Sequence, residues 1–186
     1  MQALLVEDDY VSSAALFTAR KYALAGHLRR YNGETFIHHP RELAVLLSRF
    51  PHNREMLAAA WLMRSVQDDY ADRDEITFNF GQKVADMTAA LKSFNLPDCG
   101  RLSTLARVNF AGIRQAEPVL QTMALADLFV LAHTISELNP EQLSHFADWL
   151  TLHLSAFPAA NPVLVDKVEN WITEIAQHQC SLEKVS

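Results

Sequence analysis

Side chains that could bind a divalent metal ion occur at three places along the chain. His38 and His39 precede a proline, Asp68 and Asp69 open a run of acids, and Asp127 lies inside a long apolar stretch. Imidazole and carboxylate groups are ligand types that suit divalent metal ions. The sequence contains no glycine-rich phosphate loop, nucleophile elbow, paired-cysteine motif or HExxH motif. Metal binding is therefore one chemistry for which these residue types are candidates.

A second group of side chains could bind an anion. Between residues 20 and 41 five basic residues stand against one acidic residue, a local charge of +4 in a chain of net charge -6. The candidate anion contacts are Arg20, Lys21, Arg30 and Arg41. Arginine pairs well with phosphate, so this segment could form one wall of a nucleotide-sized cleft. The alternative is a solvated basic face with no ligand.

The composition indicates which elements must position these residues. Of 186 residues 49% are apolar and 20% are charged, the balance of a globular chain with a sizeable core. Only 5 glycines and 7 prolines are present, too few turn-forming residues for a many-stranded sheet. We therefore expect an all-α fold that forms a single domain over residues 1–186.

Charge and targeting features restrict the cellular compartment and the classes of binding partner that we expect for the protein. An acidic chain is a poor general ligand for nucleic acid or for an anionic membrane. No stretch approaches the roughly 20 uninterrupted apolar residues of a membrane span. Cys99 and Cys180 form no spacing motif and suit a reducing compartment, and the first residues lack the features of a signal peptide. The sequence thus predicts a cytoplasmic protein with neither nucleic acid nor membrane as partner.

Helix boundaries are indicated by caps, prolines and glycines. Ser12 or Ser13 can cap the first helix, Asn53 a later one, and Asn161 the last. Seven to nine helices are expected. The helices expected are 14–28, a segment from Pro40 to Phe50, a central buried segment after Asn53, 76–80 ending at Gly81, a segment ending near Ser93, 118–137, and two that begin at Pro140 and Pro162.

Four segments in register resemble one known family. They are Arg30–Pro40 (RYNGETFIHHP), Ala59–Asp68 (AAWLMRSVQD), Phe80-Gly81 and Leu125–Asp127 (LAD). They resemble the alarmone hydrolase domain of RelA/SpoT-type proteins in its small single-domain form, within the HD superfamily of metal-dependent phosphohydrolases. The resemblance implies an HD-type helical bundle. The family reaction removes a 3′-pyrophosphate from a guanosine alarmone with a divalent metal, commonly manganese.

Carried over residue by residue, the resemblance keeps part of the family site. His39 matches the histidine ligand that precedes proline, and Asp127 matches the last metal ligand. Asp68 matches the second acid of the family's catalytic acidic pair. The resemblance therefore implies a remnant metal site at His39 and Asp127, with Asp68 as the retained catalytic acid.

The departures from the family pattern are as informative as the matches. Met63 stands at the family's second histidine ligand, Arg64 at its ligand aspartate, and Gln67 at its catalytic glutamate. Two protein ligands are a poor cage for a dissociable metal, and a guanidinium places positive charge where the metal belongs. We hypothesise that Arg64 replaces the metal and pairs with Asp127, Asp68 or both. An unpaired buried charge would cost roughly 3–5 kcal/mol.

Three functions stay open at this stage. The first is a catalytically degenerate homologue that binds a guanosine or adenosine polyphosphate or acts in regulation, with no cofactor. The second is an active phosphohydrolase that binds Mn²⁺ in a rebuilt site. The third is a protein-interaction module in which the cleft is closed. An oligomer or a protein partner is compatible with each of them.

Overall fold

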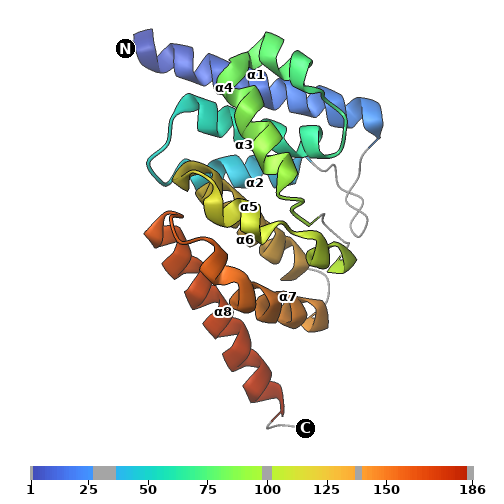
Figure 1. Ribbon diagram of the computed structural model, residues 1–186, viewed down its shortest axis with the longest axis vertical. Helices are drawn as coiled ribbons and strands as arrows, with labels where there is room; N and C mark the ends of the chain where they lie inside the picture. The colour runs from blue at the N-terminus through green and yellow to red at the C-terminus, as the bar shows by residue number, and fades with distance from the viewer. Residues whose placement is uncertain (1, 27–36, 98–101, 137–139, 184–186) are drawn as a thin grey trace. The chain divides into compact units, whose positions relative to one another are not determined.

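The structure, a computed structural model, describes residues 2–26, 37–97, 102–136 and 140–183 (Figure 1). Regular structure in these ranges is entirely helical, with eight α-helices and two short 3₁₀-helices. The expected all-α class and the expected number of helices are confirmed. The chain divides into two compact units, Met1–Leu96 and Pro97–Ser186, which are described separately below as the first and second units.

The first unit is built around one central helix. Its helices are α1 (Gln2–Ala25), α2 (His38–Leu47), α3 (Arg54–Gln67) and α4 (Arg73–Ser93). Helix α3 packs against each of the other three, because its run from Ala58 to Met63 is apolar on several faces. Asn53 caps its first turn, since the Asn53 side chain accepts a hydrogen bond from the Met56 amide at 2.9 Å. The buried central helix and its cap were both predicted.

Helix α1 differs from the sequence prediction. It begins at Gln2 and ends at Ala25, before Gly26, rather than spanning 14–28. The Ser13 hydroxyl donates to the Asp9 carbonyl at 2.7 Å within the helix, so it caps no helix start. A serine that bonds back to the preceding turn is compatible with a continuing helix, which explains the error.

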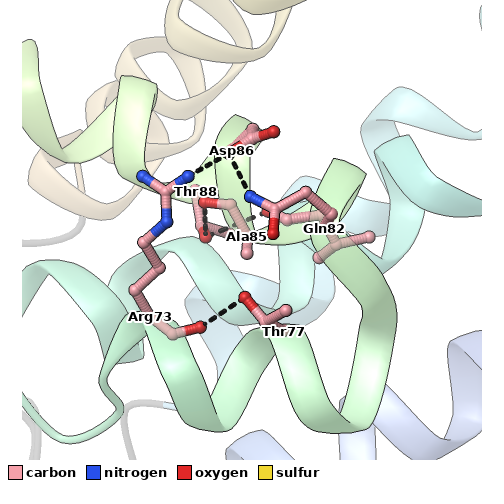
Figure 2. A network of polar contacts seen from close by, with 7 residues as sticks. Arg73, Thr77, Gln82, Ala85, Asp86 and Thr88 are labelled. Atoms are coloured by element: carbon pink, nitrogen blue, oxygen red, sulfur yellow. Dashed lines mark hydrogen bonds and ion pairs between the residues drawn. The ribbon is translucent and has the colours of Figure 1, made fainter.

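Helix α4 changes direction at Gly81, as the sequence predicted. Gly81 has φ 82° and ψ 165°, a conformation that side-chain-bearing residues rarely adopt. Figure 2 shows the polar network that bridges this kink: Arg73, before it, is ion-paired with Asp86, after it. The Gln82 amide also donates to Asp86, at 2.7 Å. From α1, the Tyr10 hydroxyl donates to the carbonyl of the residue before Gly81, at 2.5 Å.

The second unit surrounds the apolar helix α6. Its elements are the 3₁₀-helix η1 (Leu102–Arg107), α5 (Phe110–Gln115), α6 (Pro118–Ser136), α7 (Pro140–His153), the 3₁₀-helix η2 (Leu154–Ala156) and α8 (Pro162–Glu183). Helix α6 packs against α5, α7 and α8. Asn161 caps α8, accepting from the Val163 amide at 3.0 Å. Pro118, Pro140 and Pro162 open helices as predicted; Asn139 lies outside the described residues.

Helix α6 is apolar along most of its length. Among the described residues it is the one helix long and apolar enough to cross a membrane, with a mean hydropathy of 1.4. However, 78% of the relevant stretch is buried inside the protein. The core helix of a globular protein has the same length and composition, and α6 fits that description.

Candidate functional site

The first retained family residue, His39, lies in the first turn of α2. Its side chain is fully buried, whereas that of the neighbouring His38 is half-buried. The helix that carries them packs on α3, which carries Met63 and Arg64. The assignment of His39 as a metal ligand rests on the resemblance alone.

The substituted pair lies in the interior of the first unit. Met63 and Arg64 are each 1% exposed, near the end of α3. Arg64 is the largest of the fully buried side chains in the described part of the chain. Arginine is almost never fully buried unless it is paired. Its position therefore calls for compensating negative charge or carbonyl groups.

The end of α3 makes contacts that the sequence did not predict. The Gln67 amide nitrogen donates to the Leu96 carbonyl at 2.6 Å, while its amide oxygen is buried without a hydrogen-bond partner. Asp68 caps the C-terminus of α3, and Asp69 adopts a positive φ of 59°. Asp69 is ion-paired with Lys92 of α4. A glutamate at position 67 could not donate to that carbonyl when ionised, so the amide has a structural role that the family acid cannot fill.

Asp127 belongs to the second unit, where it is fully buried in the middle of α6. The residues that follow it, from Leu128 to Leu131, are also buried, at 4% exposure or less. A charged carboxylate in such surroundings needs a partner. The stretch that follows Asp127 is therefore apolar as well as buried.

The predicted anion contacts have different surroundings. Lys21 is ion-paired with Glu75 at 2.6 Å, and its ammonium lies 5.2 Å from the centre of the Phe17 ring. Arg20 is exposed on α1 and Arg41 is exposed on α2. Arg30 lies outside the described residues. The charge of Lys21 is therefore already compensated, which leaves Arg20 and Arg41 as the described candidates with exposed guanidinium groups.

The side chains at two of the positions that the resemblance aligns with metal ligands are not the types that manganese prefers. In the ranges that the structure describes, no three His, Cys, Asp or Glu side chains gather where they could hold a metal ion. At two of the family's ligand positions stand a thioether and a buried guanidinium, and the guanidinium cannot lose its proton. A fixed positive charge there opposes a second cation.

Comparison with known proteins establishes the class. The HD domain family model matches residues 14–127, from α1 into α6, so the chain belongs to the HD domain family. Two rice proteins, the probable chloroplastic GTP diphosphokinases RSH2 and RSH3, are each 34% identical to this chain over 98 residues. The alignment covers 52% of this chain and 13% of each rice protein. The predicted RelA/SpoT-type membership within the HD superfamily is confirmed.

Proposed function

We propose that this protein is a RelA/SpoT-type HD protein that has lost metal-dependent hydrolysis and serves as a nucleotide-binding or regulatory homologue. The observation that carries the proposal is Arg64, fully buried at the position of the family's ligand aspartate. The substitution does more than remove a ligand, because it introduces a permanent positive charge in the interior. A cation at that place takes over the charge of the metal but cannot activate a water.

The retained acids support this interpretation. Asp127 is fully buried and Asp68 is partly buried, although neither has a metal to neutralise it in the proposed state. Removing one partner from a buried charged group leaves the other uncompensated, at a cost of several kcal/mol. Retention of Asp68, which caps the C-terminus of the same helix that carries Arg64, is therefore consistent with charge replacement at an inherited site.

A phosphate-bearing nucleotide is the ligand that we propose. Arg20 and Arg41 are exposed cations in the first unit, and a guanidinium pairs with phosphate through two parallel hydrogen bonds. The two rice relatives are named for a guanosine nucleotide substrate. A guanosine polyphosphate is accordingly the first ligand to test, and an adenosine polyphosphate the second.

The loss of hydrolysis is tested by restoring the family pair. The wild-type protein should release no pyrophosphate from a guanosine alarmone with added manganese. The double variant Met63→His with Arg64→Asp should bind manganese in calorimetry, because it returns two ligands and removes the cation. Manganese-dependent hydrolysis by the wild type would overturn the proposal and favour a rebuilt metal site. Absence of metal uptake by the folded double variant would contradict an inherited site.

Nucleotide binding is tested by thermal shift. A ligand that binds only the folded state raises its melting temperature, so guanosine or adenosine polyphosphate should stabilise the wild type. The Arg20→Ala and Arg41→Ala variants should show a smaller shift, whereas Lys83→Ala, an exposed cation of α4, should behave as the wild type. No shift at millimolar ligand would reject the nucleotide-binding role and favour a protein-interaction module.

A further inference from the structure

The second unit contains an aromatic cavity that is lined by none of the residues that the family resemblance assigns. It has a volume of about 470 Å³, within the usual range of roughly 300–1,000 Å³ for small-molecule sites. Residues from η1, α5, α7 and the link between η1 and α5 line it, principally Leu105, Val108, Phe110, His145, Trp149 and His153. None of the described residues that line it carries a carboxylate, an ammonium or a guanidinium.

Three of the rings that line this cavity contact one another. Phe110 of α5 stacks on His153 of α7, with ring centres 4.2 Å apart and planes 12° apart. Trp149 lies against both, at 5.5 Å from Phe110 and 5.2 Å from His153. All three residues are only half-buried. Aromatic surface that is fixed by its neighbours and still accessible is a platform on which a planar ring can stack.

The histidines provide polar groups at this platform. The Nδ1 atom of His153 lies 2.7 Å from the Trp149 carbonyl oxygen. A carbonyl can only accept, so Nδ1 carries the proton and Nε2 of the neutral ring is an acceptor. His145 lies one turn before Trp149 on the same helix, with an exposed side chain. The two histidines are eight residues apart on α7, about 12 Å along a helix, too far to share a metal ion.

We propose that this cavity binds an uncharged planar heteroaromatic ring of nucleobase size. Aromatic walls favour stacking, an imidazole acceptor favours a ring that presents an N–H donor, and the absence of charge disfavours a site that reads phosphate. The inference is independent of the nucleotide proposed for the first unit, because its ligand is recognised by the base alone.

Phosphate-free nucleosides test this site without engaging Arg20 or Arg41. Adenosine and guanosine are titrated into the full-length protein by calorimetry, with ribose and inorganic tripolyphosphate as probes that lack a base. At least one nucleoside should bind and the two controls should not. Trp149→Ala should weaken binding by about tenfold or more, the range for loss of one stacking side chain. His145→Ala, at an exposed position, should weaken it by a smaller factor.

A matched control lies on the same helix. Leu152 of α7 is 78% exposed and is not among the residues that line the cavity, so Leu152→Ala should bind as the wild type does. If Trp149→Ala does not fold by circular dichroism, His145→Ala decides the matter. Three results would overturn the proposal: neither nucleoside binds at millimolar concentration, binding survives the cavity substitutions unchanged, or the probes without a base bind equally well.

Discussion

Arg64 and Arg73 are the same residue type on two helices that pack together, yet their surroundings are opposite. Arg64 of α3 is 1% exposed, whereas the Arg73 side chain of α4 is 56% exposed and ion-paired with Asp86. Water solvates the second guanidinium whether or not it is paired, while the first depends on the protein for compensation. A charge on the surface therefore says little about function. A buried charge needs a specific partner in the protein, so it is more informative about a candidate site than an exposed one.

The largest expected effect comes from neutralising the buried cation. Arg64→Met, which keeps an unbranched apolar chain of related length, should lower the free energy of unfolding by roughly 3–5 kcal/mol, because the group that Arg64 contacts in the interior would lose its partner. Urea denaturation with a two-state fit measures it. A loss below about 1 kcal/mol, the range of exposed ion pairs, would mean that the buried Arg64 contributes no more to stability than the exposed Arg73. It would contradict the contrast between the two arginines.

Double-mutant cycles can show which acid depends on Arg64. Arg64→Met is combined in turn with Asp68→Asn and with Asp127→Asn, and the coupling free energy is taken from each cycle. An acid that compensates the guanidinium should show a coupling of about 1 kcal/mol or more, since contacting residues typically couple by 0.5–3 kcal/mol. Coupling to neither acid would contradict the charge-replacement hypothesis directly.

The next largest change in stability is expected on substitution of the partly buried Gln67. Gln67→Glu restores the family's residue but replaces the donor to the Leu96 carbonyl with a carboxylate. We expect a loss of about 1–3 kcal/mol at neutral pH, the cost of an unsatisfied buried group. Burial beside a carbonyl would raise the pKa of the new carboxyl above its ordinary value of about 4.3. The loss should therefore shrink as pH falls toward about 4.3, because the folded state takes up its proton first and regains a donor, and it should stay constant below that pH. A pH-independent loss would reject the hydrogen bond as its cause.

The fold was predictable where local chemistry determines it. Asn53 and Asn161 cap helices because an Asn side chain accepts the free amides of a first turn. Gly81 breaks α4 because its φ of 82° suits glycine. The start of α1 was wrong because a serine can stand inside a helix as well as before one, and the choice at Ser13 depends on residues outside that turn.

The site was predictable only in its residue types. Motif positions identify Met63 and Arg64 as substitutions, but the complete burial of Arg64 depends on how three other helices pack on α3. The hydrogen bond of Gln67 joins residues 29 apart, and the ion pair of Lys21 joins residues 54 apart. Neither contact has a local pattern, so sequence periodicity contains no signal for them.

A smaller effect is expected at the kink. The Tyr10 hydroxyl donates to the Phe80 carbonyl, so Tyr10→Phe should cost about 1 kcal/mol at neutral pH. Burial, followed by the nearby charge of Glu55, raises the pKa of Tyr10, although Arg54 opposes the shift. The folded state thus keeps the Tyr10 proton to a higher pH than the unfolded state does. Wild-type stability should therefore fall as pH rises above about 10. The variant lacks this titration, so its deficit should narrow there in denaturation curves. A constant deficit would contradict the shift.

The smallest effect should come from the exposed arginine. In Arg73→Ala the Asp86 carboxylate keeps its hydrogen bond from Gln82, as Figure 2 shows. A cation in the first turn of a helix also opposes the helix dipole, and its removal offsets part of the lost ion pair. We expect a loss of about 0.5 kcal/mol or less that shrinks further in high salt. Urea denaturation at two ionic strengths measures it. A loss as large as that of Arg64→Met would mean that burial does not separate the two arginines.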